Sequence, residues 1–380
     1  MIDAPLRILP VSTKADMEAF IALPYRLHQN DENWVPPLQV ERRELLDPKK
    51  NPFMRRATVQ LWIAQRGDKT VGRISAHIDP MVEKVRGAGE GHFGMVEAED
   101  DPAVFHALFA TAEKWLSDQG AVSSIGPFNL SINEEIGVLV DGRDTPPMLM
   151  MGHDLPYVAD RIAEQGYDQV RDVYAYIWET GSAMPSTLQA YQKRPLPKGV
   201  VVRPINMKNY HEEVRILVDI FNDAWSENWG FIPLTDEEAE VMAKQLRPLI
   251  IPELVWFVEV EGSPAAFMVC LPNVNEAISD LNGKLLPFGW AKLLWRLKVK
   301  GLKSARVPLT GVRRKYLKNM LGPMLVGTLM HHLFREATAR GMERVEVSWI
   351  LEENTPMRRL AKKMGTRHYK TYRMFQKSLA

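Results

Sequence analysis

Apolar residues along the chain follow two periods that alternate. Two pairs of short apolar runs flank Gly-containing turns, at 61–64 with 71–76 and at 255–258 with 265–269, which predicts two β-hairpins. Two longer stretches repeat apolar residues at helical spacing and end at Gly120 and Gly341. Their apolar positions are Val104, Phe105, Leu108, Phe109, Ala112, Trp115 and Leu116, then Leu325, Val326, Leu329, Met330, Leu333, Phe334 and Ala337.

The same order of elements occurs twice. A helical stretch leads into an apolar strand at 161–178 and again at 359–375. Between the halves, the Pro- and Ser-bearing stretch 181–199 is typical of a linker.

The chain of 380 residues, with 46% hydrophobic residues, is long enough for two domains with full cores. We therefore expect an α/β (α+β) protein with two similar units, 1–182 and 200–380, each a mixed sheet flanked by helices.

Composition excludes several classes of protein. The net charge of +1 argues against a general nucleic-acid binder. The single cysteine, Cys270, lies in an apolar run, so we expect a buried thiol rather than a nucleophile or a disulfide. The adjacent His331 and His332 have no metal-ligand spacing with acids, and no metal is expected. Because residues 1–5 contain no signal core and no run could span a bilayer, we expect a cytoplasmic protein, soluble or peripheral on the inner membrane.

The two long helices begin with opposite charge. The first follows Glu97, Glu99, Asp100 and Asp101, whereas the second follows Arg313, Arg314, Lys315 and Lys318. A helix N-terminus with its free N–H groups binds anions, and cations strengthen the effect while acids repel phosphate. The second helix is thus the predicted anion site.

The order after Gly311 is a basic loop, a helix, a strand, Asn354, a short helix and a Tyr-rich strand. This order resembles the cofactor half of a GNAT-type N-acyltransferase. The resemblance implies acyl-CoA as substrate, with a strand that opens to the pantetheine and a helix that faces the pyrophosphate. The residues it assigns to acyl-CoA are Leu309, Gly311, Val312, Arg314, Lys315, Lys318, Asn319, Met320, Leu321, Gly322 and Asn354.

The pyrophosphate loop departs from the family pattern of Arg/Gln-x-x-Gly-x-Gly/Ala. Residues 317–322 keep only the final glycine, Gly322, and Met320 brings a side chain where the backbone normally meets phosphate. Either the basic residues hold the pyrophosphate differently or binding is lost. We expect acyl-CoA to bind, and only to the second half.

Amide formation needs a base for the amine proton and gains from an acid at the leaving thiolate. For the base we consider Glu352, Glu353 and His153, each of which has an ordinary alternative as a solvated acid or a core histidine. The family's tyrosine acid falls at Ala361, so Tyr372 or Tyr316 would replace it, unless each is simply half-buried.

Other assignments also have two interpretations. Asn354 either caps the following helix or contacts the pantetheine, and both are compatible. Polar loops predict acceptor contacts, although turn formation and a hydrophobic lid would explain them equally. The predicted substrate residues are Asn129, Asn133, Glu134, Trp225, Asn228, Trp229 and Asn275.

An insertion at 273–303 distinguishes the second half. It mixes leucines and tryptophans with lysines, which is typical of an interfacial helix on an anionic membrane. The predicted membrane residues are Trp290, Lys292, Trp295 and Arg296. The alternative is a core-packed helix with a solvated basic face.

Taken with the tandem units, this insertion makes the chain similar to the bacterial GNAT-like N-acyltransferases that include bacterial ceramide synthases. The resemblance implies direct transfer from long-chain acyl-CoA to a lipid amine such as a sphingoid base. The alternatives are an acetyltransferase for a small polar amine and a non-catalytic tandem GNAT that acts as a binding module.

Overall fold

The computed structural model describes residues 4–180, 184–193, 195–318 and 320–379, and these form two compact units. The first contains residues 4–172, 278–290 and 370–379, and the second contains the described residues of 173–277 and 291–369. These boundaries differ from the expected division at 182 and 200, because the final strand of each sequence half belongs to the unit built mainly from the other half.

The first unit is a mixed sheet with the strand order β1-β2-β3-β4-β5-β13, and β6 pairs with β13. All neighbours are antiparallel except β4 and β5, which are parallel. Its strands are β1 (Leu6–Pro10), β2 (Thr58–Arg66), β3 (Lys69–Ile78), β4 (Glu90–Ala98), β5 (Ser123–Gly126), β6 (Val138–Asp141) and, from Lys370 on, β13 (Arg367–Ser378). Its helices are α1 (Lys14–Leu27), α2 (Gln39–Leu45), α3 (Pro52–Arg56), α4 (Pro80–Arg86), α5 (Pro102–Asp118) and α6 (Val158–Ala163).

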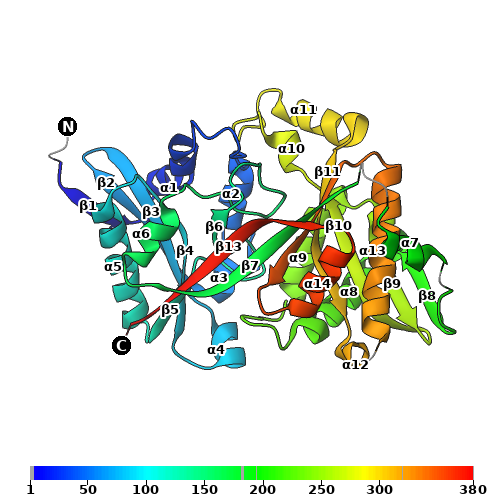
Figure 1. Ribbon diagram of the computed structural model, residues 1–380. Coiled ribbons are helices and arrows are strands. Elements are labelled where there is room, and N and C mark those ends of the chain that lie inside the picture. Colours follow the sequence, from blue (N-terminus) through cyan, green and yellow to red (C-terminus); the bar gives the residue numbers. More distant parts are fainter. Residues whose placement is uncertain (1–3, 181–183, 194, 319, 380) are drawn as a thin grey trace. The chain divides into compact units, whose positions relative to one another are not determined.

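Side chains that alternate along β2 explain the two layers of this unit. Trp62 and Ala64 face a core shared with α5, whereas Leu61 and Ile63 face a second core shared with α1 and α3. Helices therefore cover both faces of the sheet (Figure 1).

The second unit repeats this topology, with the strand order β8-β9-β10-β11-β12-β7 and one parallel pair, β11 with β12. The predicted repeat is confirmed. The strands are β7 (Asp168–Glu179, from Val173 on), β8 (Val200–Pro204), β9 (Val255–Val260), β10 (Ser263–Pro272), β11 (Ser304–Val312) and β12 (Arg344–Leu351). The helices are α7 (Ser186–Lys193), η1 (Met207–Asn209), α8 (Tyr210–Trp225), α9 (Asp236–Leu246), η2 (Arg247–Leu249), η3 (Pro252–Leu254), α12 (Arg314–Leu317), α13 (Leu321–Ala339) and α14 (Thr355–Lys363).

Helix α13 packs on the sheet through the apolar residues that the sequence predicted, and Gly341 follows its end with φ +67°. The stretch 181–199 is not a plain linker: α7 lies within it, and Leu188 is buried in the α13 core. Between β10 and β11 lie α10 (Asn275–Ile278), α11 (Gly289–Trp295) and the π-helical turn η4 (Arg296–Lys300). None of the described helices is long and apolar enough to cross a bilayer.

Candidate active site

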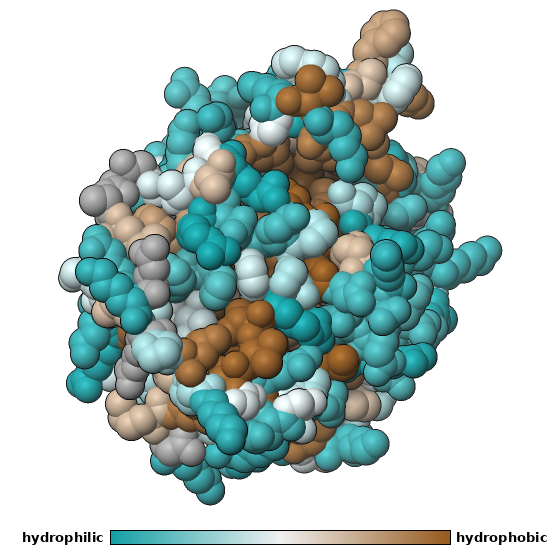
Figure 2. Space-filling view, turned by 90° about the vertical axis from the view of Figure 1, so that its right-hand side faces the viewer, coloured by the Kyte–Doolittle hydropathy of each residue, from teal (hydrophilic) through white to brown (hydrophobic). Residues whose placement is uncertain are grey.

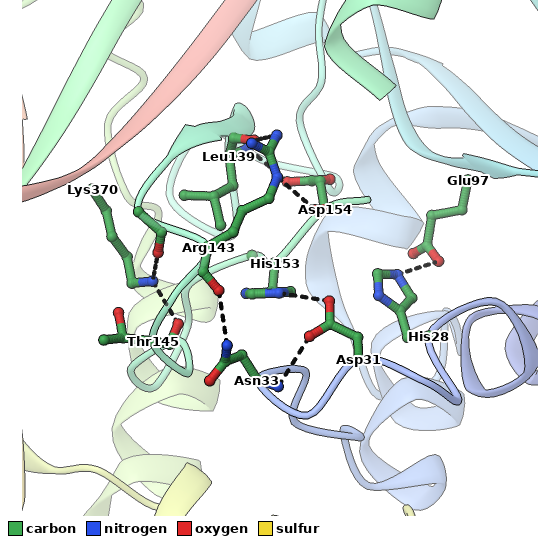
Figure 3. A network of polar contacts seen from close by, with 12 residues as sticks. His28, Asp31, Asn33, Glu97, Leu139, Arg143, Thr145, His153, Asp154 and Lys370 are labelled. Atoms are coloured by element: carbon green, nitrogen blue, oxygen red, sulfur yellow. Dashed lines mark hydrogen bonds and ion pairs between the residues drawn. The ribbon is translucent and has the colours of Figure 1, made fainter. Parts of the chain in front are cut away.

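A histidine–aspartate pair lies at the centre of a polar network inside the first unit (Figure 3). His153 lies between β6 and α6, and its Nε2 is 2.9 Å from Oδ2 of Asp31, which follows α1. Among the described residues, the buried Nδ1 of His153 has no hydrogen-bond partner. Because the Asp31 carboxylate can only accept, Nε2 carries the proton and Nδ1 keeps its lone pair. This is the tautomer that a general base needs.

The surroundings of the pair favour a neutral imidazole beside a charged carboxylate. Burial lowers the pKa of His153 below its usual value, although the Asp31 carboxylate opposes this shift. Burial raises the pKa of Asp31, but His153 and the Asn33 N–H outweigh burial, and the pKa stays below its usual value. At neutral pH the imidazole is therefore neutral and the carboxylate charged.

A second histidine–acid pair belongs to the same network (Figure 3). Nε2 of His28 is 3.5 Å from Oε2 of Glu97, and the His28 ring stacks on Trp34 at 4.8 Å between centroids. Burial raises the pKa of Glu97, but Arg73 at 2.7 Å and then His28 lower it to about 2. Glu97 is thus a partly buried carboxylate that stays charged beside His28.

The loop that carries His153 is tied down by two cations. Arg143 donates to the carbonyls of Leu139 and Asp154, and Lys370 Nζ donates to the carbonyls of Gly142 and Thr145. Asp154 itself accepts the Leu139 N–H at 2.7 Å, and burial raises the pKa of this carboxyl to about 6. These contacts fix the backbone on either side of His153 and so orient its ring.

The structure separates the predicted catalytic residues into the two units. His153 belongs to the network, and Tyr372 is fully buried in the same unit, where its hydroxyl donates to the Gly152 carbonyl at 3.2 Å. Glu352 and Glu353 lie in the turn after β12 in the second unit, where Arg358 donates to the Glu352 carbonyl at 2.7 Å.

Sequence reasoning missed four members of the network: His28, Asp31, Glu97 as part of a site, and Asp154 as a titrating group. Asp31 and His153 lie 122 residues apart, so no local spacing could reveal the pair. The only local signal was the adjacent His153-Asp154.

Among the described residues, no group of three His, Cys, Asp or Glu side chains is placed to hold a metal ion.

The second unit has an opened sheet at the strand predicted to bind pantetheine. Parallel pairing of β11 with β12 covers Ser304–Val307, and β11 then continues to Val312 with Leu309 and Gly311 in this extension. Trp225, the last residue of α8, donates its indole N–H to the Thr310 carbonyl at 2.9 Å. The structure thus brings a predicted substrate residue to the predicted cofactor strand.

The basic residues after this strand differ in their partners. Arg313 pairs with Asp219, and Arg314 pairs with Glu227, so these two guanidiniums tie the α12 region to α8 and the turn after it. Lys315 lies 4.9 Å from the Tyr316 ring centroid, and Lys318 is exposed. The predicted anion site therefore rests on the two lysines more than on Arg314.

Gly322, the glycine that the family pattern keeps, lies in the first turn of α13 and packs against the segment before it. A Cβ on Gly322 would lie 2.8 Å from the Tyr316 carbonyl oxygen, so this position needs glycine for packing alone. Leu321 begins α13, and Met320 is 84% exposed. Asn319 lies outside the described residues.

Asn354 caps α14, with its side chain accepting the Met357 N–H at 3.1 Å, which confirms the capping interpretation. Two of the other predicted acceptor residues of the second unit lie in the turn after α8, and the third begins a short helix. The Asn228 N–H donates to the Trp225 carbonyl, Trp229 follows it, and Asn275 begins α10.

In the first unit the equivalent opening is closed by the chain itself. Parallel pairing of β4 with β5 covers Glu90–His92, and the loop after β5 then lies against β4. Asn129 Oδ1 accepts the Met95 N–H at 2.8 Å, and the Phe128 N–H donates to the Phe93 carbonyl at 2.9 Å. The side chain of Asn129, a predicted substrate residue, thus occupies a backbone N–H of β4.

The neighbouring predicted residues belong to the same turn. The Asn133 N–H donates to Ser131 Oγ at 3.2 Å, and the Glu134 N–H donates to the Ser131 carbonyl at 3.0 Å. These two backbone contacts are those expected of a turn.

Asn129→Ala should lower the free energy of unfolding by about 1–3 kcal/mol, because the Met95 N–H would lose its acceptor. Urea unfolding measures this change, and hydrogen exchange at the Met95 amide should become faster. Asn209→Ala is a suitable control, since the Asn209 side chain does not cap its helix. Equal stability of both variants would show that Asn129 has no such structural role.

Comparison with known proteins identifies the family. The chain is 52% identical over 378 residues to the bacterial ceramide synthase of Caulobacter vibrioides (strain NA1000 / CB15N), which covers 99% of this chain and 98% of that protein. The chain belongs to the bacterial ceramide synthase family. It is also 44% identical over 366 residues to Protein YghO of Escherichia coli (strain K12), over 96% of this chain and 94% of that protein. No family model matches the sequence.

Solved structures show the fold of this family member. A tandem GNAT protein from the clavulanic acid biosynthesis pathway has a TM-score of 0.58 at 13% identity and covers 99% of both chains. A GCN5-related N-acetyltransferase from Sphaerobacter thermophilus has a TM-score of 0.52 at 14% identity, over 98% of this chain and 96% of that one. The tandem GNAT fold and the family predicted from sequence are both confirmed.

Proposed function

We propose that the protein is an acyl-CoA-dependent N-acyltransferase that forms an amide on a lipid amine such as a sphingoid base. The observation that carries this proposal is the 52% identity, along nearly the full chain, to a protein named bacterial ceramide synthase. It favours a long acyl chain and a lipid acceptor over an acetyltransferase for a small polar amine. We also propose that the protein works in the cytoplasm, at the inner face of the membrane.

The proposed reaction determines which chemical groups the site must supply. The neutral amine attacks the thioester carbonyl carbon, the C–N bond forms, the C–S bond breaks and the CoA thiolate leaves. The amine proton must pass to a base. His153 suits this role, because Asp31 holds its Nε2–H and its Nδ1 lone pair is unused among the described residues. Glu352 and Glu353 stay as competing predictions.

Acyl-CoA binds the second unit only, in our proposal. β11 extends beyond its pairing with β12 from Pro308 to Val312; the Thr310 carbonyl already accepts from Trp225, and the other backbone groups of this extension would face the pantetheine, as in the GNAT resemblance. In the first unit, Asn129 takes the Met95 N–H. There Glu99 pairs with Arg26 and Lys69, and Asp101 pairs with Arg66, so these cations are already engaged by acids and are not available to a pyrophosphate.

A direct assay tests the function. Purified protein is incubated with a long-chain acyl-CoA and a sphingoid base, and mass spectrometry measures the amide product and free CoA. We expect both in equal amounts, and much less product from acetyl-CoA with a small polar amine. An acyl-CoA that binds but never turns over would instead indicate a non-catalytic binding module.

Transfer should be direct, without an acyl-enzyme. Cys270 is fully buried on β10, and burial strongly raises the pKa of its thiol, so the thiolate nucleophile is not formed. Cys270→Ala should therefore keep activity within about twofold, apart from a small packing loss. Initial-rate lines at several acyl-CoA concentrations should intersect. Parallel lines together with a trapped acylated protein would contradict direct transfer.

A further inference from the structure

The segment from Leu281 to Lys303, called here the 281–303 segment, is strongly basic. It contains no aspartate or glutamate. Its cations are Lys284, Lys292, Arg296, Lys298, Lys300 and Lys303. A chain with an overall net charge of +1 thus concentrates six positive charges within 23 residues.

Six large apolar side chains of the same segment are exposed to solvent, while its other leucines are half-buried. Neither α11 nor η4 buries a single residue, so the core-packed alternative for this helix is wrong. Leu286 and Phe288 are each 79% exposed and Val299 is 72% exposed, and about half of each of Trp290, Leu294 and Trp295 is exposed as well. Figure 2 shows apolar surface at the top of the face drawn, the level at which α11 lies in Figure 1. Exposed apolar residues gathered in this way mark a contact surface.

Contacts at both ends hold the segment on the fold. The Gln39 N–H donates to the Gly283 carbonyl at 3.0 Å, and the Lys303 N–H donates to Glu276 at 2.9 Å. Arg296 donates to the Ala277 carbonyl at 2.7 Å, so this predicted membrane residue serves to anchor the segment. The ends are thus fixed while the middle presents leucines, aromatics and lysines outward.

We propose that the 281–303 segment docks the protein on the surface of an anionic phospholipid bilayer. The apolar side chains would enter the interface, and the lysines would meet the lipid phosphates. Charge complementarity selects this partner. A symmetric contact with a second copy would set the exposed Lys284, Lys298 and Lys300 of one copy against the same lysines of the other, which repel. The inference does not depend on catalysis, although a lipid amine acceptor would lie in the same membrane.

Vesicle flotation tests the proposal with the full-length protein. Wild type should float with vesicles of phosphatidylcholine mixed with phosphatidylglycerol, and much less with phosphatidylcholine alone. Added salt should weaken binding, since the screening length is only about 10 Å at 0.1 M. Each of Lys292→Gln, Lys298→Gln and Lys300→Gln should lower the partition coefficient about fivefold, so that the triple variant loses on the order of 100-fold.

A second triple variant, Phe288→Ser with Trp290→Ser and Trp295→Ser, should also stop flotation. The matched control is Val85→Ser with Val122→Ser and Val201→Ser, which removes three other exposed apolar side chains. Circular dichroism should show all variants folded. The proposal would be overturned if wild type did not float, if both 281–303 variants floated like wild type, or if sedimentation showed these residues holding two copies together. None of these readouts uses turnover, so their failure leaves the proposed acyl transfer untouched.

Discussion

His153→Gln should lower kcat/KM for amide formation by about 10²- to 10⁴-fold, the usual contribution of a general base. Glutamine keeps a side chain of similar size that can still donate to Asp31, but it offers no nitrogen lone pair for the amine proton. The buried Nδ1, without a partner among the described residues, is the atom that the substitution removes. Steady-state rates with the lipid amine and acyl-CoA measure the effect.

Two controls make this result specific. His106→Gln replaces an exposed histidine on α5 of the same unit and should leave the rate unchanged. Glu352→Gln and Glu353→Gln test the competing bases in the second unit. If either glutamate variant loses activity while His153→Gln keeps it, the base has been assigned to the wrong residue.

The pH profile separates a base from a merely structural histidine. Only neutral His153 accepts a proton, so the rate should fall as the pH drops through its pKa. Burial places this pKa below 6.5, and Asp31 opposes that shift. Asp31→Asn removes the charge that raises the pKa of His153, so the fall of the rate on the acid side of the profile should move to still lower pH. The maximal rate should also fall, because Asp31 no longer orients the His153 ring with a charged hydrogen bond. Asp154, with a pKa of about 6, titrates in the same window, and Asp154→Asn separates its contribution.

The pattern of apolar and polar residues over short stretches of sequence predicted much of the fold. The hairpins, the long helix at Leu321–Ala339 and the cap at Asn354 all follow from residues within a few positions of one another. The repeated order then predicted two units of one topology. What local pattern could not show is that β13 completes the first unit and β7 the second, because exchanged strands keep the same apolar sequence whichever sheet receives them.

The residues of the candidate site were harder to predict for the same reason. Lys370 meets the carbonyls of Gly142 and Thr145 more than 220 residues away, which no spacing rule could anticipate. Asn129 has the residue type and the loop of a substrate contact, yet its oxygen holds the Met95 N–H. For the 281–303 segment, periodicity left a buried and an interfacial helix equally open; the structure argues against the buried helix, and the interfacial one stays a proposal.

Charge reversal at and just after α12, before α13 begins, should abolish most acyl-CoA binding. Lys315→Glu with Lys318→Glu should raise the Kd at least tenfold, because each cation within reach of a phosphate contributes about 1 kcal/mol or more. Among the described residues, Met320 makes no side-chain cap on α13, and the dipole of this helix would add to the attraction at the proposed anion site. Calorimetry with a long-chain acyl-CoA should show one site in wild type.

The contacts that Arg314 makes within the second unit allow a control for this experiment. Arg314 already pairs with Glu227 and with Ser226 at 3.3 Å, so Arg314→Gln should affect binding less than either lysine reversal. Lys208→Glu with Lys244→Glu makes the same change of charge elsewhere in the second unit, on η1 and α9, and controls for long-range attraction. Two equal sites in wild type would mean that the first unit binds acyl-CoA despite its closed strand. An unchanged Kd after the Lys315 and Lys318 reversals would mean that the pyrophosphate lies away from this loop, since phosphate oxygens beside two new carboxylates could not bind with the original affinity.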